Sequence, residues 1–125
     1  FLFCPEGAAG LVSGQDDTVR AVAKEIRTLE DRARLLGKGL SVEITGHTDR
    51  SGSEEYNLVL SRERADFVRS VLIAAGLRGI NMKTVGAGHS EPLREEVTKQ
   101  DRDSNRRVSF NIILTDASPP EGGGP

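Results

Sequence analysis

The sequence is poor in cysteine and in aromatic residues. Its single cysteine, Cys4, excludes a disulfide within the chain and a zinc site built from several cysteines of one chain. There is no Trp, and there are only one Tyr and four Phe, which disfavours an aromatic platform for stacking single-stranded nucleic acid. We expect Cys4 to be a small buried hydrophobe rather than a reactive thiol.

The chain also lacks a surplus of one charge and a long apolar run. It has 17 Lys and Arg against 19 Asp and Glu, so the basic surplus typical of nucleic-acid binding is missing. No run of about 18 apolar residues is present, and we expect no segment of this sequence to span a bilayer. The first residue is Phe rather than Met, which indicates a mature or excised piece of a longer protein.

What is present fits one folded domain. The chain has 125 residues, of which 36% are hydrophobic and 29% charged, close to the globular average once 14 Gly are added. Residues 116–125 are rich in Pro and Gly and are expected to form a disordered C-terminal tail. The domain is therefore predicted to cover residues 1–115.

Apolar periodicity predicts an α/β fold. Helices are expected at residues 16–36 and 54–75, and strands at 1–4, 40–45, 81–85 and 106–115. Residues 90–102 are expected to form a loop, with one helical turn as an option. Ser53 is the expected N-cap of the second helix. Five apolar residues of that helix are expected in the core: Leu60, Phe67, Val68, Val71 and Leu72.

The order β-α-β-α-β-loop-β favours a small sandwich, with a mixed sheet and helices packed on one face. Asp49 lies just past the carboxyl end of the second predicted strand, where open α/β sheets bind ligands. On the helix that follows, Asn57, Ser61 and Arg64 share one face, because seven residues nearly complete two turns. The polar first turns of this helix are therefore expected near Asp49.

Two interpretations of this arrangement stay open on spacing alone. An Asp49–Arg64 salt bridge would staple the loop to the helix. Alternatively, Asp49 would bind the ammonium of a zwitterion, and Arg64 would hold its carboxylate through the planar guanidinium fork. Both charges would then stay partly solvated until the ligand replaces water, and Asn57 and Ser61 would add neutral hydrogen bonds.

Catalytic, metal and cofactor sites are not expected. A metal pair of His47 and Asp49 lacks further ligands, since only His89 remains as a second histidine. Ser61 belongs to a helix without a nucleophile elbow, which disfavours a Ser-His-Asp triad. The segment 86–88, Gly-Ala-Gly, lacks the third glycine of a dinucleotide loop and is expected to let two backbones pass closely or to shape the crevice wall. His47 is expected to pack the loop with a hydrogen-bonded ring.

Four linked motifs resemble the OmpA-like domain, which occurs in OmpA-type porins, peptidoglycan-associated lipoproteins and MotB-type stator proteins. The first two resemble its G-H-T-D…G…N-x-x-L-S-x-x-R-A signature: residues 46–49 with Gly52, and residues 57–65. The others resemble its G-x-G…P and R-x-x-N-R-R-V segments: residues 86–88 with Pro92, and residues 102–108. The resemblance covers about residues 1–114. The charged loop 94–103 departs from the pattern, with Asp101 where the family often has Gly.

The resemblance implies a non-catalytic module that binds bacterial peptidoglycan through the diaminopimelate of the stem peptide. It assigns Asp49 and Arg64 as the key pair. The candidate ligand-binding residues are Asp49, Arg64, Asn57, Thr48, Ser61, Leu60, Asn105 and Arg106. We expect Arg106 to buttress the crevice by pairing with an acidic group or with loop carbonyls. Asn105 is expected to hydrogen-bond the Asp49 loop or the ligand.

The resemblance also implies a place in a Gram-negative-type envelope. The domain is expected in the periplasm, tethering an envelope protein to the cell wall. It would be attached to the outer membrane, or to the inner membrane if stator-like, only through a missing N-terminal region that is a barrel, a lipid anchor or a transmembrane helix. Dimerisation is left open, and so are two other functions: a hydrolase of the same polymer that uses Asp49 as acid or base, and a protein-interaction domain that has lost its ligand.

Overall fold

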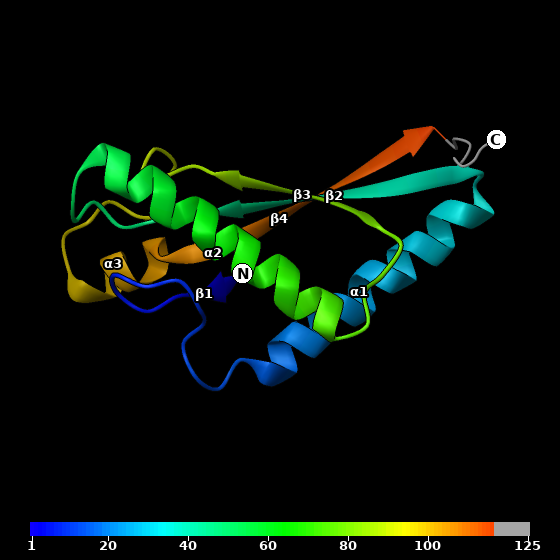
Figure 1. The fold of residues 1–125 in the computed structure, drawn as a ribbon, viewed down its shortest axis with the longest axis horizontal. Helices are drawn as coiled ribbons and strands as arrows, with labels where there is room; N and C mark the ends of the chain where they lie inside the picture. Colours follow the sequence, from blue (N-terminus) through cyan, green and yellow to red (C-terminus); the bar gives the residue numbers. More distant parts are fainter. Residues whose placement is uncertain (117–125) are drawn as a thin grey trace.

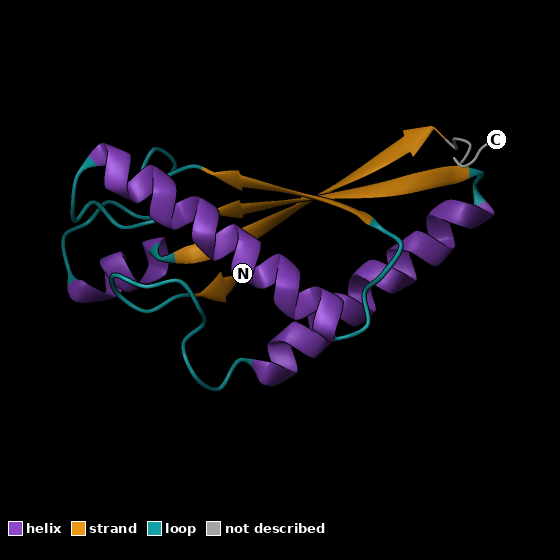
Figure 2. Cartoon of the chain, viewed as in Figure 1, coloured by secondary structure: helices purple, strands orange, loops and turns teal. Residues whose placement is uncertain are grey.

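A four-stranded sheet and three helices make up the fold in the computed structural model, which describes residues 1–116 (Figures 1 and 2). The elements in chain order are β1 (Leu2–Phe3), α1 (Asp16–Leu35), β2 (Lys38–Gly46), α2 (Glu54–Ala74), β3 (Asn81–Gly86), α3 (Lys99–Asn105) and β4 (Arg107–Asp116). The expected α/β class is confirmed, as are the positions of the two long helices.

The sheet is mixed, with strand order β1-β4-β2-β3. β2 and β3 are parallel because α2 crosses between them, whereas β4 runs antiparallel to both β1 and β2. Gly46 at the end of β2 pairs with Gly86 of β3 and with Val108 near the start of β4. The loops after β2 and β3 and the residues before β4 therefore meet at one end of the sheet.

The core lies between α1, α2 and one face of the sheet. Leu40, Val42 and Ile44 of β2 are buried on this face and alternate with partly buried residues on the other. Both long helices contribute buried residues to the same cluster, among them Ile26 of α1 and Val68 of α2. Packing of the helices on one face, as predicted, is therefore confirmed.

Phe67 does not belong to this core, contrary to the prediction, and 41% of its surface is exposed. It lies one residue before the fully buried Val68, so its side chain is turned by about 100° around α2. There it lines a surface cleft between α2, the start of α1 and the segment before α1. Val71, also predicted as core, is partly buried and packs against the cluster.

Two glycines allow α2 to lie unusually close to the sheet. A Cβ atom on Gly46 would stand 1.8 Å from the Ser61 carbonyl oxygen, and one on Gly86 would stand 2.8 Å from the Arg62 nitrogen. No side chain fits at either position without moving the helix backbone. The expectation that residues 86–88 let two backbones pass closely is confirmed. Gly46 of β2 allows an equally close approach of α2.

The start of α2 is defined as the sequence predicts. Ser53 is the N-cap, and its Oγ accepts a hydrogen bond of 3.1 Å from the Tyr56 N–H. Glu54 and Glu55 occupy the first turn, where the helix dipole favours negative charge. This cap sets the direction in which the first turns of α2 leave the Asp49 loop.

The charged segment before β4 contains the short helix α3, where the sequence predicts a loop with one helical turn as an option. Thr98 and Asp101 form a capping box: the Thr98 Oγ1 accepts from the Asp101 N–H, and the Asp101 carboxylate accepts from the Thr98 N–H. The acid at position 101, which departs from the family pattern, therefore stabilises the start of α3.

The boundaries of β4 also differ from the prediction. The strand begins at Arg107 rather than at Arg106, which is the C-cap of α3. It includes Asp116, which pairs with Lys38 of β2 and so does not belong to the predicted tail. The rest of that tail, residues 117–125, lies outside the described residues.

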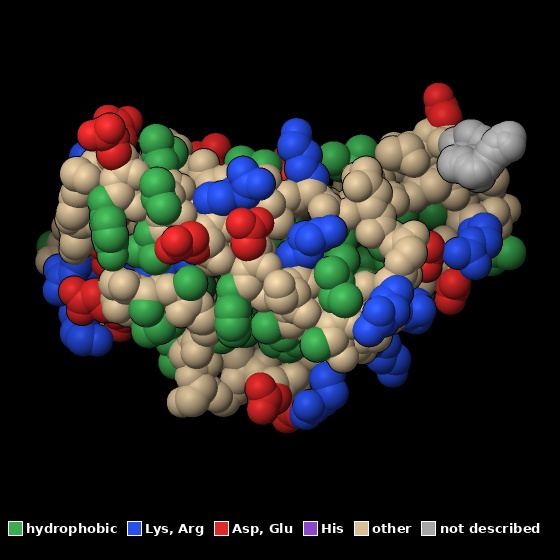
Figure 3. Space-filling view, in the orientation of Figure 1, with side chains coloured by type: hydrophobic (Ala, Val, Ile, Leu, Met, Phe, Trp, Pro, Cys, Tyr) green, Lys and Arg blue, Asp and Glu red, His purple; other side chains and the backbone are tan. Residues whose placement is uncertain are grey.

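The surface carries both signs of charge. Figure 3 shows acidic and basic side chains mixed over the visible face, with acidic groups near the start of α2. Within residues 1–116, none of the helices combines the length and the apolar character that a membrane span requires.

Candidate functional site

A small cavity of about 130 Å³ lies at the sheet end where β2 finishes and α2 begins. Its lining comes from four separate parts of the chain: Glu6 and Gly7; Thr48, Asp49, Ser51 and Gly52; Tyr56, Asn57, Leu60 and Arg64; and Arg106. Six of the eight predicted ligand-binding residues line it: Asp49, Arg64, Asn57, Thr48, Leu60 and Arg106. We call this space the Asp49 cavity.

Arg64 is almost completely buried, with 1% of its surface exposed, and its guanidinium forms three hydrogen bonds within the protein. Its Nε, Nη1 and Nη2 atoms donate to the carbonyl oxygens of Ala8 (3.0 Å), His47 (3.0 Å) and Pro5 (2.7 Å). A guanidinium has five N–H groups, so two remain without a partner among the described residues. Burial lowers the pKa of Arg64. The side chain is thus fixed in orientation and keeps donors for a ligand.

Asp49 pairs with Arg106 and not with Arg64. Its Oδ2 accepts from Arg106 Nη1 at 2.7 Å, and its Oδ1 accepts from the Ser51 N–H at 2.9 Å. Burial opposes ionisation of this carboxyl, but the hydrogen bonds from Arg106 and Ser51 outweigh it and lower the pKa of Asp49. The stapling interpretation is therefore wrong, because Arg106 enters from the start of β4 and takes the place expected for Arg64.

The expected partial solvation of the two charges is also wrong. Only 4% of Asp49 and 1% of Arg64 are exposed. Each charge is instead compensated inside the protein, Asp49 by Arg106 and Arg64 by backbone carbonyls. The lowered pKa of Asp49 keeps its carboxylate ionised at neutral pH, and an arginine side chain stays protonated in proteins, so both groups carry their charges before a ligand arrives.

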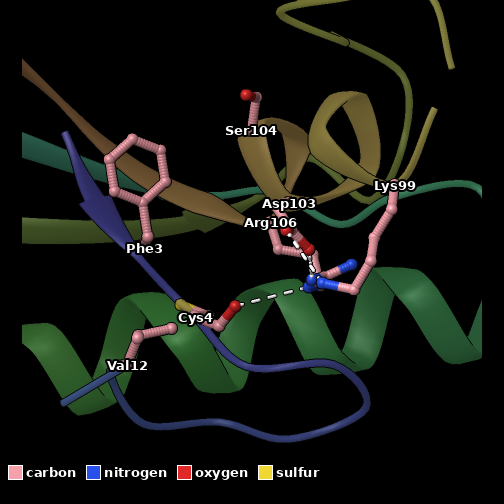
Figure 4. Close-up of a pocket in the computed structure, with 7 residues that line it drawn as sticks. All are labelled: Phe3, Cys4, Val12, Lys99, Asp103, Ser104 and Arg106. Carbon is pink, nitrogen blue, oxygen red and sulfur yellow. Dashed lines mark hydrogen bonds and ion pairs between the residues drawn. The ribbon is translucent and has the colours of Figure 1, made fainter.

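Arg106 connects the Asp49 cavity with a second cavity on its other side. Its Nη2 pairs with Asp103 of α3, and its Nε donates to the Cys4 carbonyl at 3.4 Å (Figure 4). The second cavity has about 430 Å³ and lies between β1 and α3, lined also by Phe3 and Lys99. The prediction that Arg106 pairs with an acidic group is confirmed, with two acids instead of one.

Cys4 lies beneath this second cavity and is 2% exposed. Burial raises the pKa of its thiol to about 11. A thiol of that pKa is protonated at neutral pH and is a poor nucleophile. Its expected role as a small buried hydrophobe is confirmed.

Asn57 and Thr48 present polar atoms close to Asp49. The Asn57 Nδ2 lies 3.4 Å from the Asp49 carbonyl oxygen and 3.1 Å from His89 Nδ1. The buried Thr48 Oγ1 has no hydrogen-bond partner among the described residues. A buried hydroxyl without a partner is uncommon, and Thr48 is one of the residues that line the cavity, so its hydroxyl is a candidate contact for a ligand.

Ser61 does not reach the Asp49 cavity, although it shares a helix face with Arg64. Its Oγ donates to the Leu58 carbonyl at 2.8 Å and accepts from the Gly88 N–H at 2.9 Å. The side chain therefore ties α2 to the loop after β3. The close approach of α2 to Gly86 turns the Ser61 side chain toward the end of β3 and the loop after it, away from the Asp49 cavity.

Asn105 does not line the Asp49 cavity either. Its Oδ1 accepts from the N–H groups of Leu93 and Arg94, and its Nδ2 donates to Glu96 Oε2 at 2.9 Å. The Glu96 carboxylate in turn accepts from the Arg50 N–H. Among residues 1–116, Asn105 therefore makes no direct hydrogen bond to the Asp49 loop, contrary to that part of the prediction, and is linked to the loop through Glu96.

His47 packs beneath the loop with its ring buried. Its Nε2 lies 2.9 Å from Ser109 Oγ, and its Nδ1 has no partner among the described residues. The predicted loop-packing role with a hydrogen-bonded ring is confirmed. Burial, together with the charge of Arg107, lowers the pKa of His47 from 6.5 to about 4. Within residues 1–116, no three His, Cys, Asp or Glu side chains gather as metal ligands would.

The lowered pKa of His47 predicts a loss of stability in mild acid. Between pH 6.5 and about 4 the unfolded chain binds a proton at this histidine that the folded protein refuses. The free energy of unfolding should therefore fall as pH drops through this window, by up to about 3 kcal/mol. Urea unfolding at pH 7 and pH 4.5 measures the effect. The variant His47→Gln should show a smaller pH dependence, and an unchanged dependence would contradict the assignment.

Sequence reasoning missed the contribution of the N-terminal loop. Glu6 and Gly7 line the Asp49 cavity, and Pro5 and Ala8 accept hydrogen bonds from Arg64. The segment between β1 and α1 has no periodicity that would place it. Its only signal is a set of glycines, of which Gly7 takes a φ of 67°.

Comparisons with known proteins agree with this fold and its motifs. The family model described as the OmpA family matches residues 15–106. The peptidoglycan-binding protein ArfA of Mycobacterium tuberculosis is 36% identical over 104 residues, which are 83% of this chain and 29% of ArfA. The peptidoglycan-associated lipoprotein of Legionella pneumophila is 39% identical over 97 residues, 76% of this chain and 54% of the lipoprotein. The chain thus spans about a third to about half of these relatives.

Solved structures show the same architecture. The peptidoglycan-associated lipoprotein of Burkholderia pseudomallei has a TM-score of 0.75 at 21% identity, covering 90% of this chain and 88% of that one. The C-terminal domain of Helicobacter pylori MotB has a TM-score of 0.74 at 24% identity, covering 94% and 86%. At such identities the likeness concerns the fold. With a family model across most of its length, the chain belongs to the OmpA family.

Proposed function

We propose that this domain binds bacterial peptidoglycan without covalent chemistry and tethers an envelope protein to the cell wall. The observation that carries the proposal is the Asp49 cavity, in which an ionised carboxylate and a pre-oriented guanidinium line one small space. Two relatives are named for peptidoglycan binding or association, and the match to one of them covers 83% of this chain. By the same reasoning the domain works in the periplasm, near the membrane that carries the tethered protein.

The ligand group that fits this cavity is the far end of diaminopimelate. That end carries an ammonium and a carboxylate on one carbon. The two remaining N–H groups of Arg64 would hold the carboxylate, with the Thr48 hydroxyl as a further donor. Asp49 would accept from the ammonium, since a carboxylate has about four acceptor sites and only two are taken by Arg106 and Ser51.

The remaining lining supports this role. Leu60 would pack against the methylene chain of the ligand, and Asn57 and Arg106 would hold the Asp49 loop and its carboxylate in place. Ser61 and Asn105 would act as positioning residues, because their side chains are fully engaged away from the cavity.

The arrangement favours binding over hydrolysis of the polymer. A general acid needs a carboxyl that is protonated near neutral pH, whereas Arg106 and Ser51 hold the pKa of Asp49 below its usual value. Glycoside cleavage further requires a second carboxyl across the scissile bond. The first-turn acids Glu54 and Glu55 do not line the cavity, and Glu6, the second acid of its lining, is solvent-exposed and lacks the burial that adapts a carboxyl to acid catalysis.

Incubation with purified sacculi tests the proposal. The domain should sediment with sacculi and release no soluble fragments from them. Release of fragments would support a hydrolase instead. Absence of sedimentation would contradict peptidoglycan binding.

Diaminopimelate-type stem peptides should bind at least about tenfold more tightly than lysine-type ones. Lysine lacks the distal carboxylate, so the buried Arg64 N–H groups would lose a charge-assisted hydrogen bond worth about 1.5–3 kcal/mol. Calorimetric titration of the two tripeptides measures the difference. Equal affinities would refute the role given to Arg64.

A further inference from the structure

The N-terminal loop forms one wall of the Asp49 cavity and is held there by hydrogen bonds from residues that line the cavity. Arg64 donates to the carbonyl oxygens of Pro5 and Ala8, and the Tyr56 hydroxyl lies 3.4 Å from the Gly7 carbonyl oxygen. Residues 5–8 therefore keep a defined position beside the cavity, although Glu6 between them is exposed to solvent.

One of the acidic residues that line the cavity comes from this loop. Arg64 and Arg106 contribute two positive charges, and Asp49 contributes one negative charge that already faces Arg106 at 2.7 Å. An ammonium approaching Asp49 would meet the charge of Arg106 as well. Glu6 is the other acidic residue of the lining, and no Lys, Arg or His among residues 1–116 forms an ion pair with it.

We infer that Glu6 is a specificity-determining residue of this cavity, because its carboxylate supplies the second negative charge for the ammonium of a zwitterionic ligand. This inference rests on the proposed function and deepens it. A carboxylate that pairs with no cation of the protein attracts the ammonium of a zwitterion, whereas a ligand that carries only a carboxylate gains nothing from it. The loop thus selects for the ammonium while Arg64 selects for the carboxylate.

The effect of Glu6 should be modest and sensitive to salt. Its side chain is solvent-exposed, and charges in that situation act through a high dielectric and are screened by ions. We expect the variant Glu6→Gln to weaken binding of a diaminopimelate peptide about two- to fivefold at low ionic strength. The difference should shrink as salt is added.

Two stem tripeptides separate an ammonium contact from a general effect on the loop. Both have the sequence L-alanyl-γ-D-glutamyl-X, where X is meso-diaminopimelate in one and L-2-aminopimelate in the other. The second lacks only the distal ammonium. Calorimetric titrations would compare the wild type, Glu6→Gln and the control Glu63→Gln, which removes an equal charge from an exposed position of α2 outside the cavity.

Glu6→Gln should weaken binding of the diaminopimelate peptide and leave the aminopimelate peptide unchanged or bound more tightly. Glu63→Gln should bind both as the wild type does. Unchanged affinity of Glu6→Gln for the diaminopimelate peptide, or an equal loss for both peptides, would overturn the inference while leaving the proposed function in place. A wild type that binds neither peptide would overturn the proposed function and the inference together.

Discussion

Replacing Arg64 with Ala is expected to abolish peptide binding and to lower the free energy of unfolding by about 2–4 kcal/mol. The substitution removes the donor for three carbonyl oxygens, at Pro5, Ala8 and His47, and empties a fully buried site. It also releases the N-terminal loop from α2. Urea unfolding and calorimetric titration measure the two effects.

The matched control is Arg62→Ala on the same helix. Arg62 is 60% exposed and pairs with Asp66 at 3.4 Å, so its loss should change the free energy of unfolding by less than about 1 kcal/mol and leave binding intact. Equal stability losses in the two variants would show that the hydrogen bonds of Arg64 contribute little. Retained binding in Arg64→Ala would remove Arg64 from the site.

The variant Gly46→Ala should lose about 3 kcal/mol or more of its free energy of unfolding. The added methyl would stand 1.8 Å from the Ser61 carbonyl oxygen and 3.2 Å from the Ala65 nitrogen, and both are backbone atoms of α2. The helix would have to move away from β2, carrying Arg64 out of the cavity. Thermal and urea unfolding would detect the loss.

Gly39→Ala on the same strand provides the control. There the added methyl would meet the Thr115 Oγ1 at 2.7 Å, which is the end of a side chain that can rotate, and the Asp116 carbonyl oxygen only at 3.9 Å. We expect a loss below about 1 kcal/mol. A Gly46→Ala protein as stable as Gly39→Ala would show that α2 is not fixed against β2 as described.

The part of the site that could be predicted from the sequence is local. Asp49 follows a strand with clear alternation, and Asn57 and Arg64 lie on a helix with a recognisable N-cap, so strand and helix periodicity place them together. The pairing of Asp49 with Arg106 spans 57 residues, and the contact of Arg64 with Pro5 spans 59. No periodic signal links positions so far apart.

In the fold, too, the elements with a local sequence pattern could be predicted, and the features that depend on distant residues could not. The long helices and the paired strands follow from apolar spacing, whereas the place of β4 between β1 and β2 depends on how the whole sheet closes. The helix α3 was predicted only as an optional helical turn within a loop, because it has seven residues and none of them is apolar. Its capping box at Thr98 and Asp101 was the one local signal for it.

A crystal of the domain soaked with meso-diaminopimelate tests the central claim most directly. We expect one end of the ligand to occupy the Asp49 cavity, with its carboxylate within hydrogen-bond distance of Arg64 and its ammonium beside Asp49. A ligand bound elsewhere, or a cavity that stays empty at saturating concentration, would contradict the claim.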